Sequence, residues 1–335
     1  MSILITGGAG YIGSHMAHHL VEAGEGIVVL DNLSTGVEKN LPKNIDFFRG
    51  DIADQALVSR LIEEHKIDSV IHFAGSVVVP ESVEKPLDYY ANNTAGARAL
   101  IETCVRHRVP NFIFSSTAAV YGSPPVIPVS EEGPTIPLSP YGRSKLMTEW
   151  ILQDTAAAHP LNFGILRYFN VAGADPKGRT GQSTPRATHL IKRACQVVTG
   201  QASRLNIFGT DYDTPDGTGV RDYIHVSDLV DIHHCVLTHL RKTGQPLLLN
   251  CGYGRGFSVR EVAATVQRIS GKHLEIEEAP RRPGDLASVV ADTAKLNRLL
   301  GWKPNYDDLD VIVTTALQWE RRLKKELDEP NAAAQ

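Results

Sequence analysis

The chain has 335 residues, roughly twice the usual length of a single hydrophobic core, so we expect one large domain and a smaller one. Hydrophobic residues make up 42% and charged residues 21%, a globular composition that excludes a disordered chain. The formal net charge is -4 and the charges are evenly spread, so nucleic acid and a membrane surface are poor candidates for partners.

The cysteines and the apolar segments together predict a cytoplasmic protein. Four cysteines, at positions 104, 195, 235 and 251, are too few and too far apart for a disulfide scaffold, so we expect reduced thiols. An apolar strand is expected from residue 2, which leaves no room for a signal peptide. No uncharged apolar run approaches the roughly 18 residues that span a bilayer.

Short β-branched strands alternate with helical patterns along the first half of the chain. Strands are predicted at 2–6, 26–31, 45–51, 69–75, 111–117 and 163–169, and helices at 15–24, 54–65, 93–107 and 141–158. The runs IVVL and VIHF lack alternation, which is typical of strands buried on both faces of a parallel sheet. The pattern predicts an α/β fold with a Rossmann-type doubly wound parallel sheet.

The composition changes after Gly173, where stretches rich in Gly, Pro, Thr and Asp indicate long functional loops. A helix and a strand are again expected over 220–240 and 247–252. We therefore predict a discontinuous division of the chain. Residues 1–173 plus 220–252 would form a dinucleotide-binding Rossmann domain, and residues 174–219 plus 253–335 a smaller α/β substrate-binding domain.

A glycine-rich loop follows the first predicted strand and opens a helix. Gly7, Gly8, Gly10 and Gly13 match both G-x-x-G-x-x-G and G-x-G-x-x-G. Such glycines let backbone amides approach a pyrophosphate at the positive end of a helix. Asp31 ends the second strand, where a carboxylate can accept from an adenosine ribose, and no nearby arginine would neutralise a 2'-phosphate. The pattern favours NAD over NADP; a turn without ligand and a capping role for Asp31 are the alternatives.

Tyr141 and Lys145 stand four residues apart, on one face of a predicted helix. A phenol titrates at about 10 in peptides, so a tyrosine base needs neighbouring positive charge, which Lys145 and an oxidised nicotinamide ring would supply. Thr117 ends a predicted strand at the edge of the sheet where ligands bind, and its hydroxyl could donate to the oxygen that Tyr141 deprotonates. A solvated helix face is the alternative for the pair.

Blocks of sequence spread along the chain resemble one known family. They include TGGAGYIGSH (6–15), SSTAAVYG (115–122), SPYGRSK (139–145), RYFNVAGADP (167–176), DGTGVRDYIHV (216–226) and PRRPGD (280–285). From residue 2 to about 320 the chain resembles the extended short-chain dehydrogenase/reductases, and within them the branch of UDP-sugar 4-epimerases.

The resemblance implies reversible inversion of C4 in UDP-glucose and UDP-galactose, through a 4-keto sugar and with tightly bound NAD. Tyr141 would be the base, Thr117 would hold the sugar oxygen, and Lys145 would bind the nicotinamide ribose. A homodimer is implied as well, through a bundle of helices that contains 93–107 and 141–158.

The resemblance also implies two sets of binding residues. Those for NAD would be Gly7, Gly10, Tyr11, Ile12, Gly13, Asp31, Asn32, Leu33, Ser34, Thr35, Asp51, Ile52, Phe73, Ala74, Gly75, Asn92, Thr117, Tyr141, Lys145 and Phe169. Those for the UDP-sugar would be Thr117, Tyr141, Asn170, His189, Leu190, Asn206, Phe208, Arg221, Arg282, Asp285 and Val289, with the two arginines clamping the diphosphate. A surface salt bridge is the alternative for each arginine.

Two positions depart from the family pattern. Many members have a lysine two residues after HFAG (72–75), where this chain has Val77, which leaves the tightness of NAD binding open. Val289 stands where a bulky tyrosine accompanies non-acetylated sugars and a small residue accompanies N-acetylated ones. Valine is intermediate, so we expect mainly UDP-galactose and UDP-glucose, with some use of UDP-N-acetyl sugars.

Other functions compete for the same residues. Dehydratases and decarboxylases of this fold carry carboxylates after the threonine, where this chain has Ala118 and Ala119, so elimination is not expected. A 4-epimerase of UDP-N-acetylglucosamine, UDP-xylose or UDP-glucuronate stays open, as does a non-catalytic NAD-sensing regulator. His15, His18 and His19 have no clustered carboxylate or cysteine beside them, so no metal is predicted.

Overall fold

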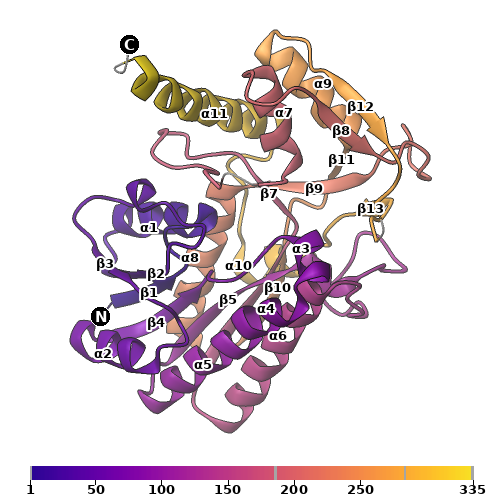
Figure 1. The fold of residues 1–335 in the computed structure, drawn as a ribbon. Helices are drawn as coiled ribbons and strands as arrows, with labels where there is room; N and C mark the ends of the chain where they lie inside the picture. The colour runs from indigo at the N-terminus through magenta and orange to yellow at the C-terminus, as the bar shows by residue number, and fades with distance from the viewer. Residues whose placement is uncertain (1, 185–186, 283, 333–335) are drawn as a thin grey trace.

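A seven-stranded parallel sheet forms the larger part of the protein, in a computed structural model that describes residues 2–184, 187–282 and 284–332 (Figure 1). In spatial order its strands are β10 (Leu247–Cys251), β6 (Asn162–Tyr168), β5 (Asn111–Thr117), β4 (Ile67–His72), β1 (Ser2–Thr6), β2 (Ile27–Asp31) and β3 (Asp46–Arg49). The strand order runs outward from β1 on one side and from β4 on the other. The predicted doubly wound topology is confirmed, with its switch point between β1 and β4.

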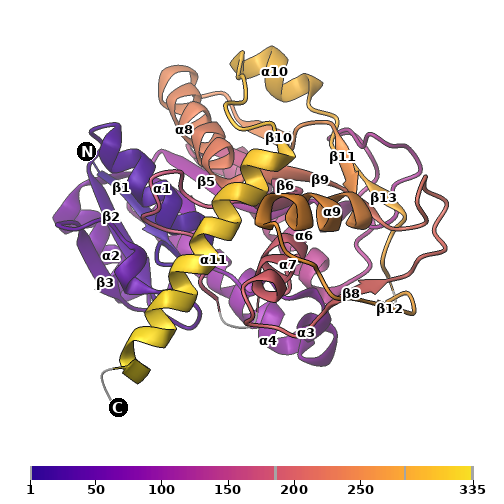
Figure 2. The same ribbon diagram turned by 90° about the horizontal axis from the view of Figure 1, so that it is seen from above.

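Helices cover both faces of this sheet (Figure 2). α1 (Tyr11–Glu22) and α8 (Val226–Thr243) pack on one face, and α2 (Gln55–His65), α5 (Ala97–Arg106) and α6 (Pro140–Ala158) on the other. Alternate residues of β1 serve the two layers: Ile3 and Ile5 pack with α1 and α8, whereas Leu4 packs with α2 and α5. Both faces are therefore buried, which explains why the strands are continuously apolar.

Short helical pieces precede α5, where the sequence predicted a helix only from residue 93. They are α3 (Val79–Glu84), α4 (Pro86–Tyr89) and a π-helical turn (Tyr90–Gly96). Prolines stand at the first turns of α3 and α4, where a missing amide hydrogen costs nothing. The π-turn places the side chain of Asn93 in the interior, 2% exposed.

The remaining strands build two small sheets. β9 (Val220–His225) pairs with β7 (Asn170–Ala172), β11 (Gly256–Ser258) and β13 (Ser288–Val289), and β8 (Leu205–Phe208) pairs with β12 (Ile276–Ala279). α7 (Leu190–Val198), α9 (Val259–Ser270) and α11 (Leu309–Ala332) pack around a separate apolar core that includes Ile191, Val266 and Val313. These three helices lie together at the top of Figure 1.

The segment 220–252 is shared between the two parts. β9 lies in the small sheet, whereas α8 and β10 belong to the large one, and α10 (Ala294–Leu300) packs against both of these. We therefore propose the discontinuous division predicted from the sequence, with its second crossing at about residue 226 instead of 220. The last three residues of the predicted segment 253–335 lie outside the described residues.

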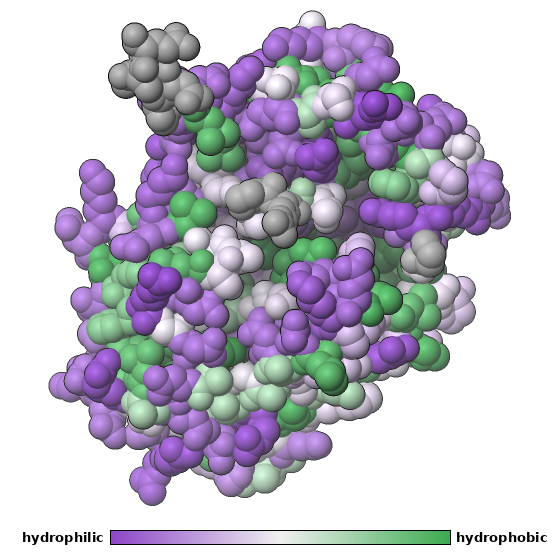
Figure 3. Space-filling view, in the orientation of Figure 1, coloured by the Kyte–Doolittle hydropathy of each residue, from purple (hydrophilic) through white to green (hydrophobic). Residues whose placement is uncertain are grey.

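Apolar side chains are exposed on the neighbouring helices α3, α4 and α6. Val83 is 65% exposed, Leu87 78%, Met147 37% and Trp150 52%. We call these four residues the α3–α6 surface; apolar side chains are visible on the lower front of the space-filling view, where these helices face the viewer (Figure 3). Across the described ranges, no helix combines the length and apolar character needed to cross a membrane.

Candidate active site

The glycine loop packs tightly on one side and is open on the other. A Cβ on Gly7 would lie 2.5 Å from the amide nitrogen of Ala74, and one on Gly13 would lie 2.2 Å from the carbonyl oxygen of Gly7. A Cβ on Gly10, by contrast, would meet only that same oxygen, at 3.1 Å. Gly10 is also the N-cap of α1, so no side chain satisfies the first amides of the helix. The loop therefore leaves free amides at a helix N-terminus, which fits a bound diphosphate.

Asp31 is tied to the same loop. Its carboxylate accepts hydrogen bonds from the amides of Ala9, over 2.9 Å, and Leu33, over 2.8 Å. Burial raises the pKa of Asp31, and the two amide hydrogen bonds oppose that rise. Each carboxylate oxygen has two lone pairs, so each can still accept from a ribose hydroxyl. Asn32 donates to the Asp51 carboxylate over 3.1 Å, which brings the end of β3 beside this position.

The other residues predicted for the cofactor follow the carboxyl ends of neighbouring strands. They are Ser34 and Thr35 after β2, Ile52 after β3, Phe73, Ala74 and Gly75 after β4, and Phe169 after β6. Because parallel strands end at the same edge of a sheet, these residues lie around the switch point.

Asn93 is a residue of this region that the sequence did not indicate. Its side chain accepts from the amide of Ser76 over 2.7 Å and donates to the carbonyl oxygen of Ser76 over 2.9 Å. The predicted Asn92 donates to the Ser76 hydroxyl over 2.9 Å. Two adjacent asparagines thus hold the segment that follows β4. The two adjacent asparagines were the only sequence signal for this role. In a regular helix neighbouring side chains point in different directions, and here the π-helical turn directs both toward Ser76.

Thr117, Tyr141 and Lys145 lie together where β5 meets α6. Ser139 caps α6 by accepting from the amide of Gly142, so the helix begins just before Tyr141. The Thr117 side chain lies near Tyr141 and acts to lower the pKa of its phenol. Lys145 is buried, and its Nζ donates to the carbonyl oxygen of Ser115 over 2.8 Å. The three predicted catalytic residues therefore face one point at the carboxyl end of β5.

Burial favours the neutral forms of both titratable groups in this trio. It lowers the pKa of Lys145 to about 8, while the charge of Glu149 opposes the change. It raises the pKa of Tyr141, and the hydrogen bond with Thr117 opposes that rise. A phenol base at this place therefore needs further positive charge beside it, such as an oxidised nicotinamide ring. The arrangement suits proton removal that is coupled to an oxidised cofactor.

The residues predicted to bind a diphosphate are held separately. Arg221 lies on β9 in register with Val289 of β13, and its guanidinium donates to the carbonyl oxygen of Val220 over 2.8 Å. Arg282 donates to Asp285 over 2.8 Å, and its guanidinium also lies over the ring of Phe208. Among the described residues the two guanidinium groups share no partner. Asp285 engages only the Nε of Arg282, so the Nη groups can still donate to a phosphate.

The predicted uracil-binding residues lie beside Arg282. Phe208 ends β8, and its ring centre is 4.5 Å from the Arg282 guanidinium. Asn206 lies on the same strand. The small sheet thus groups Asn206, Phe208, Arg282 and Asp285 at one end of the site.

Tyr11 connects the glycine loop with the substrate side. Its hydroxyl donates to the carbonyl oxygen of Gly173 over 2.7 Å, and its ring centre is 6.5 Å from that of His189. Burial lowers the pKa of His189. His189 and Leu190 open α7, and the predicted Asn170 lies on β7.

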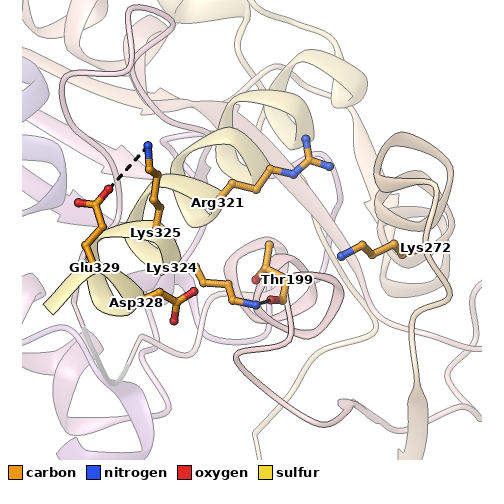
Figure 4. A pocket seen from close by; sticks show the side chains of 7 residues that line it. All are labelled: Thr199, Lys272, Arg321, Lys324, Lys325, Asp328 and Glu329. Carbon is orange, nitrogen blue, oxygen red and sulfur yellow. Dashed lines mark hydrogen bonds and ion pairs between the residues drawn. The ribbon is translucent and has the colours of Figure 1, made fainter. Parts of the chain in front are cut away.

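A hollow of about 410 Å³ lies apart from these residues, beside α7, α9 and α11 (Figure 4). Its lining is formed by Thr199, Lys272, Arg321, Lys324, Lys325, Asp328 and Glu329. Lys324 donates to the carbonyl oxygen of Thr199 over 2.8 Å. The Nζ of Lys325 lies 3.7 Å from Oε1 of Glu329, so part of the positive charge of the hollow is already paired. We place no substrate there. In the part of the chain that the structure describes, no group of three His, Cys, Asp or Glu side chains could hold a metal ion.

A doubly wound sheet, an open glycine loop and a tyrosine–lysine pair define the class of Rossmann-type enzymes that work with a dinucleotide cofactor. Residues 3–252 match the NAD dependent epimerase/dehydratase family, and the chain belongs to that family. The resemblance found in the sequence is thereby confirmed.

Relatives extend the match over nearly the whole chain. A protein of Azospirillum brasilense named UDP-glucose 4-epimerase is 55% identical, over 98% of this chain and 95% of its own length. The crystal structure of UDP-glucose 4-epimerase from Brucella ovis in complex with NAD has a TM-score of 0.93 at 43% identity, covering 96% of this chain and 98% of that one. The UDP-Glc/GlcNAc 4-epimerase from Campylobacter jejuni has a TM-score of 0.83 at 46% identity, covering 96% and 99%.

Proposed function

We propose that this chain catalyses the reversible epimerisation of UDP-glucose and UDP-galactose at C4, with NAD as its cofactor. The observation that carries the proposal is the grouping of Thr117, Tyr141 and Lys145 at the carboxyl end of β5, on a sheet whose first turn is an open glycine loop. Full-length relatives are named UDP-glucose 4-epimerase, which supports the same reaction. A role in galactose metabolism is proposed with it.

Tyr141 is the proposed base. It removes the proton from the 4-hydroxyl of the sugar, and the Thr117 hydroxyl holds that oxygen in line. The Lys145 ammonium stabilises the phenolate and binds the nicotinamide ribose. Bound NAD would supply the hydride acceptor for C4 and then the donor; return of the hydride to the opposite face of the 4-keto sugar would invert C4 with no net oxidation.

The cofactor is held by backbone and side chains at the edge of the large sheet. The amides of Tyr11 and Ile12 open α1 and would bind the diphosphate, where the helix dipole favours negative charge. Asp31 would accept from the adenosine ribose. The neighbouring side chains Asp51 and Ile52 would flank the adenine. Val77 gives no polar anchor here, and the segment after β4 is instead held by hydrogen bonds of Asn92 and Asn93 with Ser76 and of Tyr89 with Val78.

The UDP moiety is assigned to the small sheets. Arg221 and Arg282 would bind the diphosphate through their guanidinium forks, which match phosphate oxygens. Asp285 would accept from the uridine ribose while still paired with Arg282, and Phe208 would border the uracil with Asn206 beside it. The remaining predicted contacts are Asn170, His189 and Leu190.

Val289 sets the proposed range of sugars. It is half-buried on β13 and packs in an apolar cluster with Val120, Tyr121 and Phe169. A valine leaves more room than a tyrosine, and one close relative is a UDP-Glc/GlcNAc 4-epimerase. We propose that the non-acetylated sugars are the main substrates and that UDP-N-acetylglucosamine is turned over more slowly. Equal turnover of UDP-N-acetylglucosamine and UDP-glucose would contradict this order.

A homodimer in the cytoplasm is the proposed state of the protein. The α3–α6 surface exposes large apolar side chains on adjacent helices, and such surfaces are commonly covered by a second copy. Cys104, Cys195, Cys235 and Cys251 are all free, which agrees with a reducing compartment. Sedimentation of wild type and of Trp150→Glu would test the interface: the charge should shift the protein toward monomer.

Two measurements on one purified sample test the proposed function: identification of the bound cofactor and an assay with a panel of UDP-sugars. NAD is released from purified protein and identified, and the same sample is assayed with UDP-glucose, UDP-galactose, UDP-N-acetylglucosamine, UDP-xylose and UDP-glucuronate. We expect bound NAD and interconversion of the first two sugars. Bound NAD without any epimerisation would favour a regulator, and faster turnover of a pentose or uronate would reassign the substrate.

A further inference from the structure

A row of polar side chains crosses three neighbouring strands at their carboxyl ends. Ser116 of β5 is in register with Arg167 of β6, and Arg167 is in register with Asn250 of β10. Residues in register on parallel neighbours point to the same face, so the three side chains lie in one line. All are buried, at 2%, 4% and 0% exposure respectively. A buried polar row is costly unless every group has a partner.

Glu149 of α6 is the partner of this row. Its carboxylate accepts from Arg167 Nε over 3.0 Å and from Arg167 Nη2 over 2.6 Å, a two-pronged ion pair, and the Ser116 hydroxyl donates to it as well. Glu149 is itself 1% exposed. The pair therefore joins α6 to β5 and β6 in a place that water does not reach.

The position of Glu149 on α6 relates the pair to the reaction. Tyr141, Lys145 and Glu149 recur every four residues, so they occupy one face of the helix on three successive turns. That face meets the last three residues of β5: Lys145 donates to the Ser115 carbonyl oxygen, Glu149 accepts from Ser116, and Tyr141 lies near Thr117. Of these three contacts, only that of Glu149 is reinforced by an ion pair to a second strand.

The other side of Arg167 leads toward the sugar-binding segment. Its Nη1 donates to the Tyr121 hydroxyl over 2.9 Å, and that hydroxyl donates to Asn250 over 2.6 Å. Asn250 donates to the carbonyl oxygen of Val129 over 2.9 Å. The Val129 amide in turn donates to the carbonyl oxygen of Val290, over 2.9 Å, next to Val289. One chain of buried hydrogen bonds thus runs from the helix of the base to the strand that borders the sugar.

We propose that Glu149 and Arg167 are positioning residues for the epimerisation, which presupposes the function proposed above. They fix the position of α6 along β5, which brings Tyr141 and Lys145 next to Thr117. The hydrogen bonds of Arg167 also connect this position to the segment that contains Val289. Neither residue touches the sugar. Displacing a catalytic group by about 1 Å can lower a rate by about 100-fold, so a loosened α6 should lower kcat with little effect on KM.

The test is a double variant that removes both charges and keeps their volume, Glu149→Leu with Arg167→Met. Apolar replacements of a buried ion pair are commonly as stable as the pair, so the unfolding midpoint and the NAD content should stay near wild type. We expect kcat to fall 10-fold to 100-fold, with KM changed by less than about threefold. A stable double variant with kcat within twofold of wild type would overturn the proposal.

A matched control separates this role from the loss of any buried ion pair. Lys192 and Glu320 form such a pair between α7 and α11, at 6% and 2% exposure, and Lys192→Met with Glu320→Leu should keep wild-type kcat. If the first double variant does not fold, Ser116→Ala tests the proposal instead, because it removes one hydrogen bond to Glu149 and leaves the Glu149–Arg167 ion pair intact. Wild-type kcat in that variant overturns the proposal, and a reduced kcat at unchanged KM supports it. Absence of epimerisation in the wild type would instead reject the function.

Discussion

Acidification from pH 7 to pH 5 should destabilise the protein through its buried histidines. Burial lowers the pKa of His72 and His225 to about 3, and that of His15 and His233 to about 4. In the unfolded chain the same rings titrate at about 6.5. The unfolded state therefore binds more protons below that pH. The stability that these rings contribute is complete above about pH 6.5 and is lost as the pH falls toward 4 and 3.

The size of the loss follows from these values. At pH 5 each of the four rings costs about 2 kcal/mol, because it is nearly fully protonated when unfolded and nearly fully neutral when folded. Asp222 acts in the opposite direction: burial raises its pKa to about 6, so the folded state takes up its proton first and gains about 1 kcal/mol by pH 5. These five groups together lower the stability by roughly 7 kcal/mol, comparable to the whole stability of many domains.

Urea unfolding followed by tryptophan fluorescence at pH 7, 6 and 5 measures this loss. His225→Gln should weaken the pH dependence by about 2 kcal/mol between pH 7 and 5, because one titrating ring is gone. His273→Gln is the control, since its ring is 80% exposed and should leave the dependence unchanged. A free energy of unfolding that is flat from pH 7 to 5, or a loss that begins only below pH 4, would refute the reasoning.

Three further predictions concern the base, the glycine loop and a helix cap. Tyr141→Phe should lower kcat by about 100-fold to 10,000-fold in a coupled UDP-galactose assay while leaving the circular dichroism spectrum unchanged; an active variant would exclude Tyr141 as the base. In protein freed of NAD, Gly13→Ala should lower the unfolding midpoint, because its Cβ would lie 2.2 Å from a carbonyl oxygen, whereas Gly10→Ala should keep that midpoint. After loading with NAD, Gly10→Ala should lose the cofactor on gel filtration. Ser258→Ala breaks a capping box on α9 and should cost about 1 kcal/mol of stability at unchanged KM.

The parts of the fold that the sequence predicted are those with a local signal. The glycine loop, Asp31 and the strand ends follow from residue types at fixed spacing, and a strand buried on both faces is recognisable from a continuous apolar run. Thr117, Tyr141 and Lys145 meet because a parallel sheet brings its strand ends to one edge.

Pairing between distant segments could not be predicted in this way. Residues 220–225 were predicted as the start of a helix, yet they form β9, which pairs with β7, β11 and β13; the helix begins only at Val226. The buried role of Arg167 could not be predicted either, because a charged residue in a strand usually indicates an exposed face. Nor does the sequence show that Glu149 and Asn250 are its neighbours. Only the register of three strands reveals that these polar groups satisfy one another.

The π-turn at Tyr90–Gly96 has a consequence for how this segment can change during evolution. A π-turn carries one residue more than the α-helical turn it replaces, and one residue corresponds to about 100° of helix rotation. Deleting any single residue there would restore a regular helix and swing Asn93 away from Ser76, whatever residue was removed. Substitutions on the outer side of the turn should be tolerated, whereas changes of length should not. Deletion and substitution scanning of 90–96 should therefore show that the segment tolerates changes of residue type but not changes of length.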